Sequence, residues 1–153
     1  MLKLKLPFPI SANRYWQIVG KRLIKTKPAR QFIAEVVYLW ITEKSKGTKS
    51  FNDNDNLALA VEVHYPIKRG PDTDLDNLCK VLIDAMETAQ IFPNDKQFKH
   101  IQLTRASTID PKGGVIVWIK KCNDYHDVKD DNIFSFLVKG IHNTGVNTYN
   151  KIT

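Results

Sequence analysis

An alternation of apolar and small or polar residues in the middle of the chain restricts the fold more than any other feature of the sequence. From Leu57 to Tyr65, large apolar residues alternate with Ala, Glu and His, and Pro66 ends the run. This period of two is typical of a β-strand. The sequence therefore predicts a strand over residues 57–65, around which the other elements must be arranged.

Two helical patterns flank this strand. The first runs from Pro28 to Lys46, and the second runs from Leu75 to Ala89. In both, apolar residues recur at intervals of three or four positions, so that they lie on one face of a helix. Both segments are predicted to be amphipathic helices that pack on a sheet.

Three shorter alternations predict three further strands, at Leu2–Leu6, around Ile101–Thr104 and at Val115–Ile119. The turn sequence of residues 110–114 predicts that the last two strands form a hairpin. Residues 11–27 are predicted to be a loop that continues as a basic arm. The resulting order, β-α-β-α-β-β, predicts an α+β fold with a small four-stranded mixed sheet and two helices.

The pattern changes near the end of the chain. All predicted elements lie in residues 1–121, which we expect to be one domain, as the length of 153 residues favours. Residues 122–153 are rich in Asn and contain one short apolar stretch, Ile133–Val138. They are predicted to be a C-terminal extension, either loosely ordered or docked on the core or on a partner.

Several protein classes do not fit this sequence. No apolar run approaches the roughly 20 residues of a membrane span, and lysines interrupt the start of the chain where a signal peptide would be apolar. The two cysteines, Cys79 and Cys122, allow one disulfide but do not support a metal cage or a disulfide scaffold. We therefore expect a cytoplasmic protein without a membrane partner.

The net charge of +7 is unevenly distributed. Residues 1–46 contain ten Lys and Arg but only two acidic residues, Glu35 and Glu43. A basic first third indicates a polyanionic partner, most often nucleic acid, although an ordinary solvated basic face is the alternative.

Carboxylates cluster where the second predicted helix begins. Asp72, Asp74 and Asp76 occur within five residues, and Lys80 and Asp84 follow Asp76 at intervals of four. Asp74 is predicted to lie near the N-cap and to accept hydrogen bonds from free backbone N–H groups, while the helix dipole favours Asp76 in the first turn. One interpretation is therefore ordinary capping with an i,i+4 charge ladder on the face opposite the apolar stripe.

The other interpretation is a metal site. Several carboxylates near one helix start repel one another, whereas capping needs only one of them. A divalent cation would relieve this repulsion, and an all-oxygen ligand set favours Mg²⁺ or Mn²⁺. A lysine beside such a site is suited to phosphodiester hydrolysis, because it stabilises the charge of the transition state.

The run Asp74-Leu75-Asp76-Asn77-Leu78-Cys79-Lys80, followed by Asp84-Ala85 and Asn94-Asp95, resembles the signature of the RusA-type Holliday junction resolvases, the crossover junction endodeoxyribonucleases. The opening Leu6-Pro7-Phe8-Pro9 and residues 11–16 are also similar to that family. The resemblance covers roughly residues 2–121. Where the family often has Asp-Asp, this chain has Asn94-Asp95.

The resemblance implies a homodimeric, Mg²⁺-dependent endonuclease that acts in DNA recombination and repair, in the cytoplasm of a bacterium or of a phage-infected bacterium. It implies symmetric paired nicks in a four-way DNA junction that leave 5′-phosphate ends, without a small-molecule cofactor. Matched by position, Asp74, Asp76 and Asp95 are the implied metal ligands, and Lys80 is the implied essential lysine. These four residues form the implied catalytic set, and Asp84 has at most a supporting role. Asp72 lies outside the match and is expected to cap or orient the loop.

Residues that flank the acids are candidates for DNA binding. Arg14, Lys68 and Arg69 are expected to contact phosphates, with solvation as the alternative. Tyr15 and Trp16 are suited to stacking on an unpaired base, but core or dimer packing is an equal alternative. The histidines show no ligand spacing.

Two other functions remain compatible with the sequence. The chain could be a non-catalytic module that binds branched or single-stranded DNA, which would need the basic arm but not the clustered acids. It could also be an interaction or dimerisation adaptor that uses Trp40 and the stretch Ile133–Val138.

Overall fold

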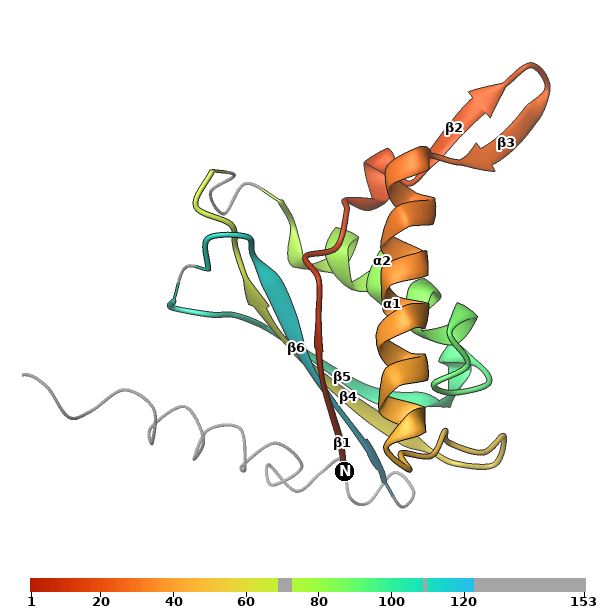
Figure 1. Ribbon diagram of the computed structural model, residues 1–153, viewed down its shortest axis with the longest axis vertical. Coiled ribbons are helices and arrows are strands. Elements are labelled where there is room, and N and C mark those ends of the chain that lie inside the picture. Colours follow the sequence, from red (N-terminus) through yellow and green to blue (C-terminus); the bar gives the residue numbers. More distant parts are fainter. Residues whose placement is uncertain (69–72, 109, 123–153) are drawn as a thin grey trace, which may run out of the picture.

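In the residues that the structure describes, the protein forms a four-stranded mixed sheet and two α-helices, so the predicted α+β fold is confirmed (Figure 1). The structure is a computed structural model that describes residues 1–68, 73–108 and 110–122. The strands are β1 (Leu2–Leu6), β4 (Leu57–His64), β5 (Phe98–Arg105) and β6 (Gly114–Lys121), and the helices are α1 (Lys27–Ser45) and α2 (Leu75–Thr88). These bounds agree closely with the predicted segments.

The sheet has the order β1-β6-β4-β5, in which only β4 and β5 are parallel. The predicted hairpin of the last two strands is therefore wrong. Strand β6 pairs on one side with β4, where Val61 lies opposite Val117, and on the other side with β1, where Leu4 lies opposite the same residue. The reason is the connection through α2, since a helical crossover makes β4 and β5 parallel neighbours and leaves β5 at the edge.

Both helices pack on the same face of the sheet. The buried residues of α1 include Phe32 and Val36, and those of α2 include Leu78 and Leu82. They form one hydrophobic cluster with the inward-facing residues of the sheet, namely Leu4 and Leu6 of β1, Leu57, Leu59, Val61 and Val63 of β4, and Val115, Val117 and Ile119 of β6. This single core fixes α2, and with it the acidic helix start.

Residues 16–25 form a second, two-stranded sheet that the sequence did not predict. Strands β2 (Trp16–Val19) and β3 (Arg22–Lys25) are antiparallel, so the prediction of a loop and basic arm is wrong at this point. Gly20 supplies the left-handed backbone, with φ of +61°, that such a tight turn requires. The hairpin projects from the rest of the domain (Figure 1), and all of β2 is exposed, so burial imposes no clear apolar alternation on it.

The base of this hairpin is fixed by Thr26, the N-cap residue of α1. The Thr26 backbone N–H donates to the Tyr15 carbonyl oxygen at 3.0 Å, and its Oγ1 donates to the Arg14 carbonyl oxygen at 2.7 Å. The same Oγ1 accepts from the Ala29 backbone N–H at 3.3 Å, which caps α1. One side chain therefore joins the hairpin to the core helix.

The remaining expectations have mixed outcomes. Trp40 is only 2% exposed, so it is a core residue and cannot form the binding surface that an interaction or dimerisation adaptor would need. Cys79 and Cys122 are buried and form no disulfide with each other. Of the helices in the described ranges, none is long and apolar enough to cross a membrane. The predicted extension from residue 123 onward, with Ile133–Val138, lies outside the described residues.

Candidate active site

Asp74 stands at the start of α2 as predicted, but its carboxylate does not cap the helix. It is the N-cap residue, with an extended backbone, and its side chain makes no capping hydrogen bond. Only its backbone carbonyl takes part, accepting from the Leu78 N–H at 3.4 Å. The predicted bonds from free backbone N–H groups to this carboxylate are therefore wrong, and the exposed carboxylate is not used by the helix start.

The polar face of α2 is arranged as predicted. Asp76 and Lys80 are exposed, and Asp84 is partly buried, whereas Leu78 and Leu82 on the other side are almost fully buried. A rise of 1.5 Å per residue separates Asp76 from Asp84 by about 12 Å along the helix axis, with Lys80 midway. The face therefore presents a cation between two carboxylates.

Asp84 lies where several candidate groups meet. Its pKa is raised above the ordinary value, chiefly because the carboxyl group is partly buried, and the Asp95 carboxylate raises it further. Lys80 and Lys25 oppose this shift. These three residues are thus close enough to act on the charge of Asp84. Sequence reasoning did not single out Lys25, although it lies in the predicted basic arm.

Asp95 opens a short 3₁₀ turn, η2 (Asp95–Gln97), between α2 and β5. The turn is closed by a capping box: Asn94 accepts from the Lys96 backbone N–H at 2.9 Å, and the Gln97 Oε1 accepts from the Asn94 backbone N–H at 3.1 Å. This reciprocal pair holds the backbone that carries Asp95. The Asn-x-x-Gln spacing was the signal that sequence reasoning missed.

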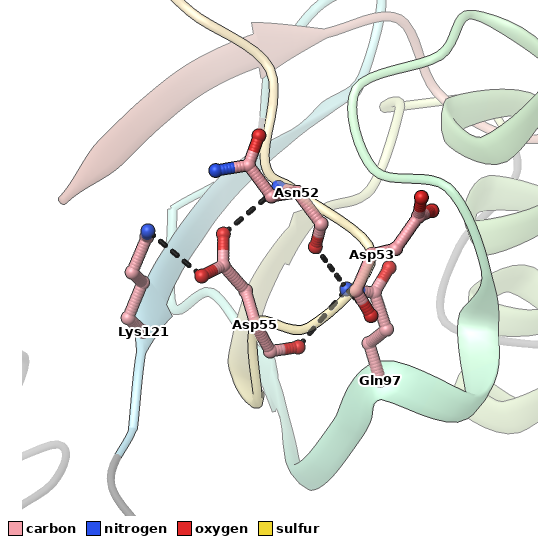
Figure 2. Close-up of polar contacts among 5 residues, drawn as sticks. All are labelled: Asn52, Asp53, Asp55, Gln97 and Lys121. Atoms are coloured by element: carbon pink, nitrogen blue, oxygen red, sulfur yellow. Dashed lines mark hydrogen bonds and ion pairs between the residues drawn. The ribbon is translucent and has the colours of Figure 1, made fainter.

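Gln97 also ties this turn to the loop that precedes β4 (Figure 2). The side chain is 7% exposed, and its Nε2 donates to the carbonyl oxygens of Asn52 at 2.7 Å and Asp55 at 2.9 Å. In the same loop, the Asp55 carboxylate contacts Lys121 Nζ at 2.8 Å and accepts from the Asn52 backbone N–H at 2.8 Å. The hydrogen bond to Lys121 is the main reason that the pKa of Asp55 lies below its ordinary value. We call this group the Asp55 network.

The other end of α2 is held by Tyr65 and Arg105, which sequence reasoning also missed. The Tyr65 hydroxyl donates to the Thr73 carbonyl oxygen at 2.7 Å, and Arg105 Nη2 donates to the same oxygen at 3.4 Å. The Arg105 guanidinium lies 5.0 Å from the centre of the Tyr65 ring. Burial raises the pKa of Tyr65, and the nearby Asp74 carboxylate raises it as well. The residue before Asp74 is therefore anchored by the residue that follows β4 and by the last residue of β5.

The described residues contain no group of three or more His, Cys, Asp or Glu side chains arranged to hold a metal ion. The assignment of Asp74, Asp76 and Asp95 as three ligands of one ion stays a prediction. The donor chemistry nevertheless fits Mg²⁺, since this ion is usually bound by one or two carboxylates together with waters and substrate phosphates rather than by an all-protein cage. Asp74 and Asp76 supply such a pair of exposed carboxylates.

The predicted DNA-binding residues differ in their surroundings. Arg14 and Lys68 are exposed, while Arg69 and Asp72 lie outside the described residues. Tyr15 is 2% exposed, so core packing is the correct interpretation for its ring, whereas Trp16 is 46% exposed. Of the two aromatic residues, Trp16 therefore presents the open surface.

Comparison with known proteins gives one family. Residues 7–120 match the family described as Endodeoxyribonuclease RusA, so the match includes the hairpin, both helices and all the acids described above. No curated protein matches the chain.

Proposed function

The chain belongs to the RusA endodeoxyribonuclease family, whose name denotes Holliday junction resolvases, and from this premise we propose that it cuts four-way DNA junctions by symmetric, Mg²⁺-dependent nicks. We place this activity in DNA recombination and repair. The single observation that carries the proposal is the helix start at Asp74, where an exposed carboxylate at an N-cap position makes no capping bond.

Asp74 and Asp76 would hold the ion, and Asp95 is the third ligand that the family resemblance implies. Bound Mg²⁺, or Mn²⁺ in its place, supplies an activated water and neutralises the phosphate. Lys80 lies one helical turn after Asp76 on the same exposed face. Its ammonium group stabilises the negative charge that develops on the phosphate as the bond to the 3′ oxygen breaks, which leaves a 5′-phosphate end.

The exposed basic residues near these acids would position the DNA. Arg14, Lys68 and Arg69 are assigned to phosphate contacts, and the hairpin adds Lys21 and Arg22, which are exposed at its end. Contacts of this kind release counterions, so we expect the affinity for a junction to fall steeply as the salt concentration rises.

A homodimer accounts for paired nicks. A four-way junction has approximate two-fold symmetry, and two copies of one chain related by a two-fold axis present two equivalent acid clusters to it. Each copy would cut one of two opposite strands. This arrangement is the reason that we propose symmetric rather than single cleavage.

The experiment is a nicking assay on a synthetic four-way junction and on a linear duplex of equal length, each with Mg²⁺ and with EDTA. We expect two symmetric nicks in the junction only, and only with the metal, and we expect the nicks to be sealed by DNA ligase because they carry 5′-phosphates. Equal cleavage of the linear duplex, or cleavage in EDTA, would contradict the proposal. Tight binding of the junction without a nick at any metal concentration would instead assign the non-catalytic binding module.

A further inference from the structure

The backbone of Asp74 is fixed on both sides although its carboxylate makes no capping bond. On the helix side, the Asp74 carbonyl oxygen accepts from the backbone N–H of Leu78, a residue buried in the core, at 3.4 Å. On the other side, the Thr73 carbonyl oxygen accepts from two donors, the Tyr65 hydroxyl at 2.7 Å and Arg105 Nη2 at 3.4 Å. The Cα atom of Asp74 therefore lies between two peptide groups that are both held.

These contacts set the direction in which the side chain of Asp74 leaves the backbone. A peptide group is planar, so the orientation of the Thr73 carbonyl also determines where the N–H and the Cα of Asp74 lie. With the peptide groups before and after it held, Asp74 keeps its extended backbone, with φ of −64° and ψ of 137°. Its carboxylate then retains only the rotations about its own side-chain bonds. The two donors thus position the carboxylate without bonding through the oxygen atoms of a cap.

The two donors are themselves held by the sheet. Tyr65 is buried, and its ring packs against the ring of Phe8, with centroids 5.4 Å apart. The guanidinium of Arg105 lies 5.0 Å from the centre of the Tyr65 ring, within the distance of a cation–π contact. Tyr65 directly follows β4, and Arg105 ends β5, where it lies opposite Val63 of the parallel neighbour β4. A site is precise when the residues that support it are fixed by packing in this way.

The Asp74 carboxylate lies close to this pair of donors. Burial raises the pKa of Tyr65 most, Arg105 lowers it, and the charge of Asp74 raises it. The carboxylate is therefore near enough to the hydroxyl for their charges to interact. The hydroxyl has one proton, which it donates to the Thr73 oxygen. It consequently leaves the acceptor positions of the carboxylate available to another ligand.

The two candidate ligands at this helix start differ in how they are held. Asp76 lies in the first turn of α2, so the helix itself fixes its backbone. Asp74 lies at the N-cap, outside the regular helix, and its position depends on the contacts to Thr73. Mg²⁺ requires nearly ideal octahedral geometry with short bonds to oxygen, so a ligand that shifts weakens its binding. Residues that orient a metal ligand therefore affect metal affinity although they do not touch the ion.

We propose that Tyr65 and Arg105 are positioning residues, which hold the peptide group before Asp74 so that its carboxylate meets the Mg²⁺ ion in the required geometry. The inference rests on the proposed function and assigns the support of its metal site. Both residues act through Asp74 and not on the reacting atoms. Their loss should therefore raise the concentration of Mg²⁺ that cleavage requires, with little effect on the rate at saturating metal.

The first test measures single-turnover nicking of a four-way junction as a function of Mg²⁺ concentration. Tyr65→Phe and Arg105→Gln each leave one donor to the Thr73 oxygen, so the half-maximal Mg²⁺ concentration should rise about threefold in each. The double variant leaves neither donor, and the rise should reach about tenfold. The rate at saturating Mg²⁺ should stay within about twofold of the wild type. The matched control is Tyr38→Phe, which removes an exposed hydroxyl on α1 and should leave the metal dependence unchanged.

A gel-shift titration in EDTA separates positioning from a direct contact between Arg105 and DNA. Arg105→Gln should bind the junction within about twofold of the wild type, because the guanidinium acts on a carbonyl of the protein itself. A variant that loses junction affinity but keeps the Mg²⁺ dependence of the wild type would make Arg105 a phosphate contact and overturn the proposal. An unchanged Mg²⁺ dependence in the double variant would overturn it as well.

A second test needs no cleavage, so its result is independent of the proposed function. The protein alone is titrated with Mn²⁺, and the free ion is followed by electron paramagnetic resonance. The double variant should bind Mn²⁺ about tenfold more weakly than the wild type and Tyr38→Phe. If the wild type nicks no junction but Mn²⁺ binding weakens in this way, the proposed function fails and the positioning role stands. If the wild type nicks as proposed but neither metal measurement changes in the double variant, the positioning role alone fails.

Discussion

The aspartates of this protein differ in whether the fold gives their carboxylates partners. Asp55 is bound on both sides, by Lys121 at 2.8 Å and by the Asn52 backbone N–H at 2.8 Å, so its charge stabilises the fold (Figure 2). Asp74 and Asp76 are exposed, and the Asp74 carboxylate forms no capping bond although it stands at an N-cap. The hydrogen-bond and ion-pair partners in the structure therefore distinguish a structural aspartate from a candidate functional one. The neighbouring residues in the sequence do not.

The two groups are connected through the turn η2. Gln97 belongs to the Asp55 network, and the capping box that it closes also fixes the backbone of Asp95. The network thus supports a candidate catalytic acid from a distance. We therefore expect substitutions in the Asp55 network to change the free energy of unfolding. Substitutions of the acids at the start of α2 should change the rate of DNA cleavage.

The largest expected effect is on catalysis. Asp76→Asn removes a carboxylate that would hold Mg²⁺, so nicking of a four-way junction should fall by at least about 100-fold. Binding of the junction should persist or tighten, because a negative charge near the phosphates is lost. Single-turnover nicking and a gel-shift titration measure the two effects. Cleavage at the wild-type rate by this variant would show that the acid is not part of the site.

The matched variant in the Asp55 network is Gln97→Met, which keeps the length of the side chain but removes its amide. The carbonyl oxygens of Asn52 and Asp55 would lose their donor in a buried place, so the free energy of unfolding should fall by about 1–3 kcal/mol. Urea unfolding measures this change. A loss below about 0.5 kcal/mol would mean that water replaces the amide and that the Asp55 network does not hold η2.

Sequence patterns predicted those parts of the fold whose side chains are sorted by burial. The alternation of 57–65 gave β4 to within one residue, and the apolar stripe of 75–89 gave α2, because the core imposes those periods. The exposed hairpin at residues 16–25 has no buried face, so its pattern carried no such information. The predicted pairing of β6 with β5 was wrong, because β6 pairs with β4. The crossover through α2 decides which strands are neighbours, and this depends on the whole chain rather than on a local pattern.

The candidate site divides in the same way. The polar face of Asp76, Lys80 and Asp84 follows from helical spacing and was predictable. The anchoring of its surroundings was not, because Gln97 reaches residues more than forty positions earlier in the chain, and the Arg105 contact to Thr73 spans the helix and a strand. Long-range hydrogen bonds of this kind leave no periodic signal in one sequence.

A smaller effect is expected from Asp55→Asn. The pKa of Asp55 is below its ordinary value of 3.8 in the folded protein, so its charge adds stability above that pH, and this contribution is lost as the pH falls through the lowered value. The variant should therefore be less stable than the wild type at pH 7, and the difference should vanish under strongly acidic conditions. Thermal unfolding across this pH range measures it, while the nicking rate of the folded variant should stay near that of the wild type. A difference that does not depend on pH would contradict the charge pairing with Lys121.

The smallest effect is expected at Asp84, where a substitution should raise stability rather than lower it. Asp84 is neither tightly paired like Asp55 nor exposed like Asp74 and Asp76. Partial burial raises its pKa in the folded protein despite Lys80 and Lys25, so stability falls as the pH rises from 3.8 to that raised value, and the full loss is present above it. Asp84→Asn should consequently raise the free energy of unfolding at pH 7, and the gain should disappear below about pH 3.8, where the carboxyl group is protonated in both states. Glu43→Gln, which breaks an exposed pair with Lys46, should show no such gain. A carboxylate that lowers the stability of the fold has a role other than stability. If Asp84→Asn instead lowers the free energy of unfolding at pH 7, Asp84 stabilises the fold as Asp55 does.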